Sequence, residues 1–169
     1  MKRLGLLWGI VALLPLGLAA HDDVNVIARF DGGIAVQPVL IDPRTFVASA
    51  NVVRGINPAV LPWTIHSLKA AVEATGELDA RGRGLVLAGG PPVGTRGDIS
   101  AVRALLFCDA SLTAHVSEPA ALDSDGDFKI VGFLTPPVGP TCDTPTLLIA
   151  IRPGPAFLWV AAGIPDNDD

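Results

Sequence analysis

The chain has 169 residues, a length typical of one domain, and 50% of them are hydrophobic while 17% are charged, which excludes a disordered protein. Twelve Lys and Arg oppose 17 Asp and Glu, a formal net charge of −5, and no basic cluster occurs. Because binding to a phosphate backbone requires such a cluster, we expect no nucleic-acid partner.

Residues 1–20 have the pattern of a secretory signal peptide. Residues 1–3 carry Lys and Arg, an apolar run extends from Leu4 to Leu18, and Ala19-Ala20 supplies the small residues that signal peptidase accepts. The alternative, a membrane anchor, needs about 20 consecutive apolar residues, whereas this run is shorter and is interrupted by Pro15. We therefore expect cleavage, a secreted or periplasmic mature protein, and no transmembrane span after cleavage.

Cys108 and Cys142 are the only two cysteines. In an exported protein an even number of cysteines indicates a disulfide, which for a loop of this length contributes about 3–4 kcal/mol of stability. A redox-active pair usually has its thiols close in sequence, and a structural zinc site needs four ligands. We therefore expect a Cys108–Cys142 disulfide.

The first strands are expected on either side of a turn. Residues 24–30 alternate between apolar and polar, Asp31-Gly32-Gly33 marks a turn, and residues 34–41 form the second arm of an expected hairpin. Another strand is expected over residues 46–52, closed by the prolines that follow at 58 and 62.

Residues 66–83 predict a second hairpin with one polar and one apolar face. Apolar side chains alternate with charged and polar ones on both sides of Thr75-Gly76. A short helix over residues 67–74 is the competing interpretation, because Lys69 and Glu73 are also spaced for a helix. The alternation continues past Gly76, so we expect strands, with residues 85–88 extending the second arm into a Gly- and Pro-rich loop, 89–97.

Five further strands are expected over residues 100–108, 112–116, 127–133, 146–152 and 156–163. In the last two, apolar residues occupy both the odd and the even positions, so we expect these strands in the centre of a sheet. Nine or ten short strands predict an all-β fold, a single β-sandwich of Ig-like or transthyretin-like type or a barrel, over residues 21–165. The acidic residues 166–169 form a tail.

Several stretches of the chain are distinctive when taken in order. They are Asn51-Val-Val-Arg-Gly-Ile-Asn-Pro58, Pro62-Trp63, Arg81-Gly-Arg-Gly-Leu-Val-Leu-Ala-Gly-Gly90, Leu106-Phe107-Cys108 and Asp125-Gly-Asp-Phe128. Together they resemble a group of small exported bacterial proteins of unassigned function, over residues 51–164. Residues 122–130 also resemble the turn and strand of carboxypeptidase-regulatory or transthyretin-like sandwiches. These resemblances imply export and a fold, but no activity.

Three histidines are candidate copper ligands. Cleavage after Ala20 would make His21 the N-terminus, whose amine and ring can bind copper together with His66 or His115. This layout resembles the histidine brace of secreted copper-binding proteins and copper-dependent polysaccharide oxygenases, which implies a copper site and oxidative activity. Cleavage after Ala19 fits the small-x-small rule better and would leave Ala20 first.

The two later histidines also have simpler interpretations. His66 shares the apolar side of its expected strand, which predicts a position in the core or at its rim with hydrogen-bonded ring nitrogens. His115 lies on the polar side and is expected in solvent.

Asp123, Asp125 and Asp127 are candidate calcium ligands, because hard cations bind several oxygens on one tight loop. The spacing is not that of an EF-hand, since Gly stands at the fourth position and Leu134 at the twelfth. Asp-Gly is also common hairpin chemistry, and a polar turn is the simpler interpretation.

Arg81, Arg83 and Arg96 flank the Gly-rich residues 84–97, whose backbone N–H groups are a candidate anion site. Neither a Walker lysine nor a dinucleotide-binding motif is present, so a solvated loop is the alternative.

The mature sequence contains no G-x-S-x-G, H-E-x-x-H or S-x-x-K motif. The leading hypothesis is therefore an exported, non-catalytic β-sandwich that binds an unknown ligand or an envelope component without a cofactor. The alternative is a metal-binding protein, either with an N-terminal-histidine copper site, which allows an oxidative enzyme, or with a weak calcium loop.

Overall fold

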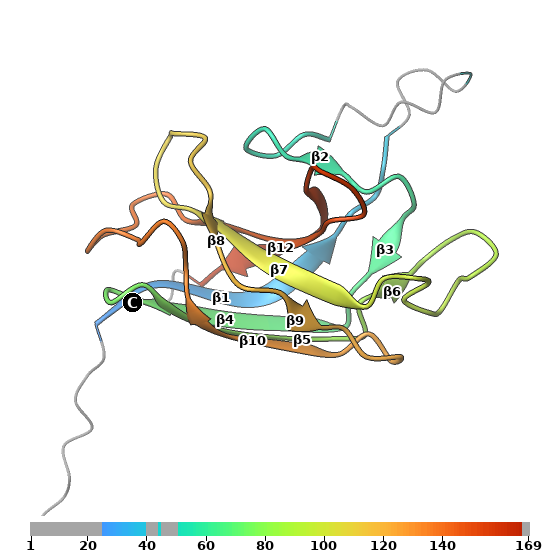
Figure 1. Cartoon of the computed structure of the whole chain (residues 1–169), viewed down its shortest axis with the longest axis horizontal. Coiled ribbons are helices and arrows are strands. Elements are labelled where there is room, and N and C mark those ends of the chain that lie inside the picture. The colour runs from blue at the N-terminus through green and yellow to red at the C-terminus, as the bar shows by residue number, and fades with distance from the viewer. Residues whose placement is uncertain (1–24, 40–43, 45–50, 167–169) are drawn as a thin grey trace, which may run out of the picture.

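The computed structural model describes residues 25–39, 44 and 51–166, and every regular element in that part is a strand (Figure 1). The strands are β1 (Val26–Ala35), β2 (Asn57–Pro58), β3 (Trp63–Thr64), β4 (Ser67–Glu73), β5 (Glu77–Arg83), β6 (Val86–Leu87), β7 (Ala101–Phe107), β8 (His115–Val116), β9 (Ala120–Ala121), β10 (Phe128–Phe133), β11 (Thr146–Ile151) and β12 (Leu158–Pro165). The expected signal peptide, His21 and residues 46–50 of an expected strand lie outside the described residues.

The main sheet has the strand order β10-β5-β4-β1-β12-β11-β7-β8, with antiparallel pairing throughout this path. It curls like a half-barrel, with β1, β4, β5 and β10 along the lower side of Figure 1. β8 is the strand at one edge of the sheet, and β10 is the strand at the other edge. Val116 in β8 forms two backbone hydrogen bonds, 2.8 and 2.9 Å long, with Thr135, which lies just after β10. The all-β fold expected of a sandwich or barrel is therefore confirmed.

The hairpin of β4 and β5 forms as expected. Ser67 pairs with Arg83 and Val72 with Leu78, and Gly76 takes the positive φ of 84° that the turn requires. Side chains alternate between the core, where Leu68 and Leu78 are fully buried, and the outer face. A helix over residues 67–74 is excluded.

Residues 24–41 do not form the expected hairpin. β1 continues through Asp31-Gly32-Gly33, pairing with β4 as far as Asp31 and with β12 up to Ala35. Gly32 has φ of 95° and the register shifts here, which identifies a β-bulge. Asp-Gly chemistry suits a bulge as well as a turn, and pairing with two distant strands keeps the chain extended.

Residues 85–88 do not prolong β5. Gly84 takes φ of 65° and redirects the chain, so that β6 pairs with β3 in a separate two-stranded sheet. The Leu85 amide donates instead to the carbonyl of Gly126, at 2.8 Å. The expected strand over 112–116 is also shortened, to β8, and Asn51 and Val52 lie outside any strand.

β11 and β12 occupy the centre of the sheet, as their apolar sequences predict, and residues 147–150 are fully buried. β2 pairs in parallel with the first residues of β12, Leu158 and Trp159. There the Trp159 indole donates to the Asn51 carbonyl and the Ala59 amide donates to the Trp159 carbonyl, both at 2.9 Å. These contacts position the residues that follow β2.

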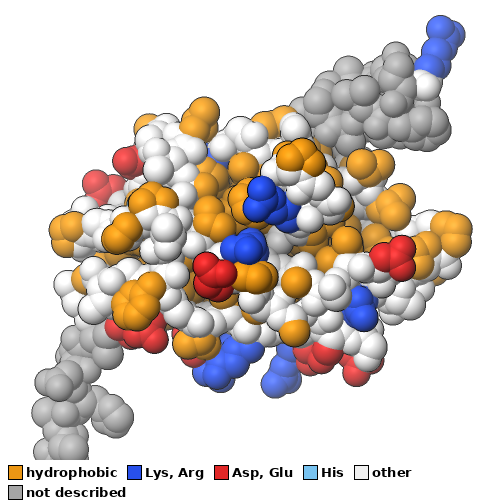
Figure 2. Space-filling model, viewed as in Figure 1, with side chains coloured by type: hydrophobic (Ala, Val, Ile, Leu, Met, Phe, Trp, Pro, Cys, Tyr) orange, Lys and Arg blue, Asp and Glu red, His pale blue; other side chains and the backbone are white. Residues whose placement is uncertain are grey.

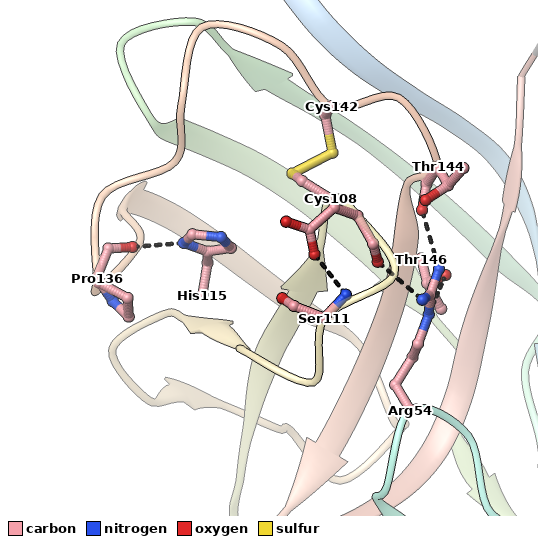
Figure 3. The surroundings of a disulfide bond; sticks show 9 residues. Arg54, Cys108, Ser111, His115, Pro136, Cys142, Thr144 and Thr146 are labelled. Carbon is pink, nitrogen blue, oxygen red and sulfur yellow. Dashed lines mark hydrogen bonds between the residues drawn. A yellow bond between two sulfur atoms is a disulfide. The ribbon is translucent and has the colours of Figure 1, made fainter.

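Cys108, directly after β7, and Cys142 form the expected disulfide (Figure 3). It closes a loop with a sequence separation of 34 residues that contains β8, β9 and β10. Within the described residues, no helix has the length and apolar character needed to cross a bilayer.

Candidate ligand-binding pocket

A pocket of about 360 Å³ lies between the small β3-β6 sheet and the ends of β11 and β12. Twelve residues line it: Ala59, Val60, Leu61, Trp63, Leu87, Pro92, Arg96, Gly97, Asp98, Ile99, Ile151 and Leu158. Figure 1 places β3, β6 and the loop after β6 at the right-hand end of the molecule, and hydrophobic side chains stand out at that end in Figure 2. Ten of the twelve residues are uncharged, so the pocket is mainly apolar.

The floor of the pocket is held by backbone hydrogen bonds. Trp63 and Leu87, both buried, are cross-strand neighbours in the small sheet. The Trp63 amide donates to the Val36 carbonyl at 3.0 Å, and the Gln37 side chain donates to the Trp63 carbonyl at 2.9 Å. These bonds tie the small sheet to the end of β1, so the floor is preformed.

One wall is the loop between β6 and β7, which its own hydrogen bonds fold into a compact unit. The Leu87 amide donates to the Thr95 carbonyl and the Gly94 amide to the Leu87 carbonyl, both at 2.8 Å. The Gly97 amide donates to the Thr95 hydroxyl at 3.1 Å. These amides are already satisfied, so this loop does not offer them to an anion as the sequence suggested.

The rim of the pocket is apolar and accessible to solvent. Val60 is 57% exposed and Leu61 is 42% exposed, and both follow β2. Val93, which follows the lining residue Pro92 but does not itself line the pocket, is also exposed. Exposed apolar side chains beside an apolar hollow are a typical feature of binding surfaces.

Two charged side chains reach the pocket. Arg96 is half-buried, and its guanidinium donates a hydrogen bond to the Ile99 carbonyl through one nitrogen. Asp98 is exposed, and the two side chains form no ion pair within the described part of the chain. Arg96 therefore retains donors for an anionic group of a ligand.

The three arginines of the expected anion site do not converge. Arg81 and Arg83 lie on the outer face of β5, whereas Arg96 lies at the pocket. Arg81 donates two hydrogen bonds to Asp79, at 3.0 and 2.9 Å, and these bonds lower the pKa of Asp79 and raise the pKa of Arg81. Only Arg96 remains a candidate for ligand binding at the pocket.

The histidines also depart from expectation. His66 is exposed at the start of β4, not in the core, because the chain turns at Gly84 opposite it and β4 begins only at Ser67. His115 on β8 is half-buried, not fully solvated, and its Nδ1 lies 2.7 Å from the Pro136 carbonyl oxygen.

The two histidines lie near opposite ends of β5. His66 lies at one end of β5, where its amide donates to the Arg83 carbonyl. His115 lies beside Pro136, three residues after Phe133, and Phe133 pairs with Glu77 at the other end of β5. Six residues of strand separate these ends, about 20 Å. One copper site therefore cannot use both His66 and His115. A pairing of either one with His21 stays a prediction.

The three aspartates near residue 125 form a tight turn. The Asp123 carboxylate accepts hydrogen bonds from the amides of Asp125 and Asp127, at 2.9 and 2.8 Å. The Asp127 carboxylate accepts one from the Gly84 amide at 2.9 Å. Over residues 25–39, 44 and 51–166, no three His, Cys, Asp or Glu side chains are gathered in a way that can hold a metal ion. This geometry favours the structural turn.

Apart from Arg96, the residues that line the pocket were not predicted from the sequence. The available signal is the apolar pair Val60-Leu61 between Pro58 and Pro62, which no strand pattern accounts for, together with Val93 after Pro91-Pro92. Comparison with known proteins adds no family: no protein-family model matches the chain, and no curated protein or solved structure shows a significant match.

Proposed function

We propose that this protein is an exported, non-catalytic binding module, and that its ligand is a small amphiphile whose apolar body enters the pocket beside Trp63. The observation that carries the proposal is a preformed apolar floor surrounded by exposed apolar side chains. The signal-peptide pattern of residues 1–20 supports export.

The size and lining of the pocket favour a small molecule. Its volume of about 360 Å³ lies at the lower end of the range for small-molecule sites, which are typically lined by apolar side chains with a few polar groups. Burial of apolar ligand surface against Trp63, Leu87 and Ile151 supplies the main driving force. Arg96 adds a charge-assisted hydrogen bond to an anionic head group.

The lining also supports a role in binding over a role in catalysis. Among the described residues that line the pocket, Arg96 and Asp98 are the only ionisable ones, and none is a His, Cys or Ser. A general base or nucleophile is most often one of those residue types, and the one carboxylate of this lining, Asp98, is exposed to solvent.

A fluorescent amphiphile tests the proposal. The mature protein is titrated with 8-anilinonaphthalene-1-sulfonate, whose aromatic rings and sulfonate match the pocket, and decanoate is then added as a competitor. We expect a saturable fluorescence increase at one site per chain and its loss on addition of decanoate. A signal that does not saturate contradicts the proposal.

Two exposed leucines provide a matched pair of variants. Leu61→Asp places a carboxylate on the rim and is expected to weaken dye binding at least tenfold, whereas Leu112→Asp, at a residue outside the pocket lining, leaves it unchanged. Arg96→Gln is expected to weaken decanoate about tenfold and decanol little, because only decanoate is charged. Equal effects of the two leucine variants would place the dye elsewhere.

A further inference from the structure

The outer face of β4, β5 and β10 carries an ordered pattern of charges. Side chains of these strands that point away from the core form rows across the sheet, because paired residues share a face. One row contains Lys69, Arg81 and Lys129, and the next contains Ala71, Asp79 and Val131. Glu73 and Glu77 end β4 and β5 at the turn.

This pattern is complementary to itself. On β4, Lys69 lies two residues before Ala71 and Glu73 lies two residues after it. On β5, Arg81 and Glu77 flank Asp79 in the same way. Consider a second copy placed face to face on the first and related to it by a twofold axis that runs perpendicular to the strands, along the row of Ala71 and Asp79. This axis places the positive side chains of one copy opposite negative side chains of the other. In each copy the opposite charges are about 14 Å apart along the strand.

Apolar side chains on the same face also lack cover. Val131 is 53% exposed and Phe133 is 65% exposed, and both point outward from β10. Val131 lies in the row of the axis, so a second copy would place its own Val131 against it. Asp79 would face Asp79 of the second copy, but in each copy its negative charge is balanced by the two hydrogen bonds from Arg81.

We infer that this face binds a second copy of the same chain in an antiparallel, twofold-symmetric dimer. Within each copy Lys69 is ion-paired with Asp31 at 2.8 Å and Arg81 with Asp79 at 2.9 Å. In the dimer Lys69 and Arg81 also meet Glu73 and Glu77 of the other copy, and the Val131 side chains meet. Sheets that pack face to face in this aligned way are common in β proteins, and such a twofold interface uses one self-complementary patch.

The size of the face predicts a weak dimer. Three strands about 4.8 Å apart and six or seven residues long offer a footprint of roughly 330 Å² per copy. A standard interface buries about 800 Å² per partner. The curl of the sheet away from the face limits further contact. The dimer is therefore expected to depend on concentration and to weaken as salt screens the charges.

Sedimentation velocity of the mature protein, from micromolar to millimolar concentration at low and high salt, measures the dimer. We expect Glu73→Lys to weaken association at least tenfold, because it opposes Lys69 of the second copy. The exchange Lys69→Glu with Glu73→Lys restores the pairing between copies but removes the ion pair of Lys69 with Asp31 within each copy, so it is expected to recover part of the loss. Val131→Lys also weakens association, whereas Val93→Lys, at a similarly exposed valine on the pocket loop, does not.

Each outcome decides the inference. A chain that stays monomeric at millimolar concentration and low salt overturns it. So does a dimer that tolerates Glu73→Lys and Val131→Lys, or one that the charge exchange fails to restore. Circular dichroism and thermal melting of each variant confirm that it is folded, so that loss of the fold is not mistaken for loss of the interface.

Discussion

Gly82 on β5 and Phe128 on β10 are direct cross-strand neighbours, and the aromatic ring occupies the space that a side chain on Gly82 would need. A Cβ atom at Gly82 would lie 2.2 Å from Cε1 and 2.3 Å from Cζ of Phe128. Both residues are buried. The contact, and not an unusual backbone conformation, is the reason for glycine at this position.

We therefore expect Gly82→Ala to lower the free energy of unfolding by about 1–3 kcal/mol, the usual cost of overpacking a core. Urea denaturation followed by tryptophan fluorescence measures it. Gly139→Ala is the matched control, because a Cβ there meets no atom within 4 Å. If the two variants unfold at the same urea concentration, Phe128 does not cover Gly82 as described.

The β4–β5 hairpin and the interior strands β11 and β12 were predictable because their patterns are local. One face of the hairpin is exposed to solvent and the other is in the core, and the interior strands carry apolar residues on both faces. The course of β1 was not predictable, because Asp31-Gly32-Gly33 suits a turn and a bulge equally. Its partners, β4 and β12, are set by contacts far along the chain.

The pocket was unpredictable for the same reason. Its floor, rim and wall come from segments that only the pairing of β3 with β6 and the parallel pairing of β2 with β12 bring together. No local sequence pattern predicts that these segments come together. The disulfide needed only a count of two cysteines and an export signal, so it could be predicted.

Removal of the disulfide should lower stability by about 4 kcal/mol, from the chain entropy of a loop of this length. The double variant Cys108→Ser with Cys142→Ser is compared with the wild type in urea. The wild type in reducing agent is expected to match the variant. A loss well below this value would show that the reduced, unfolded chain keeps structure within the loop.

Arg54 joins three segments near the disulfide (Figure 3). Its guanidinium donates to the Asp109 carbonyl at 2.8 Å, the Thr144 carbonyl at 3.2 Å and the Thr146 hydroxyl at 3.2 Å. Its φ is 50°, in the left-handed region that non-glycine residues rarely adopt. The side-chain contacts thus hold a backbone conformation that costs about 1 kcal/mol.

Variants of Arg54 separate the two effects. Arg54→Ala loses the hydrogen bonds and keeps the strained backbone, so we expect a loss of about 2 kcal/mol. Arg54→Gly loses the same bonds but relieves the strain, and is expected to be about 1 kcal/mol more stable than Arg54→Ala. Thermal melting and urea curves measure the difference. A less stable glycine variant would contradict the strained φ.

Asp123 stabilises its turn through its own carboxylate. Asp123→Ala removes the acceptor of two amide hydrogen bonds and is expected to cost about 1 kcal/mol. Asp123→Asn keeps an acceptor oxygen and is expected to cost less. Millimolar calcium should leave the melting temperature of the wild type unchanged, whereas a rise on addition of calcium would revive the calcium site.

The ion pair of Asp79 and Arg81 predicts a dependence of stability on pH. The hydrogen bonds from Arg81 lower the pKa of Asp79 in the folded state, so the folded chain binds this proton less readily than the unfolded chain. The contribution is therefore present above the unfolded pKa of about 3.9 and is lost as pH falls through the lower folded value. Stability should decrease with pH in this acid range.

Asp79→Asn tests this sign. We expect the wild type to melt at a higher temperature than the variant at about pH 6, and the two to converge once the pH falls below the lowered pKa of Asp79, where the carboxylate is protonated. Because both side chains are partly exposed, 64% for Arg81 and 44% for Asp79, the difference is expected to be small and to shrink in high salt.

Glu118→Gln, which removes an exposed carboxylate outside any ion pair of the described residues, is the control. Measurements at micromolar concentration keep the inferred dimer dissociated, so the difference reports the ion pair alone. A difference that grows as pH falls would reverse the assigned direction of the pKa shift.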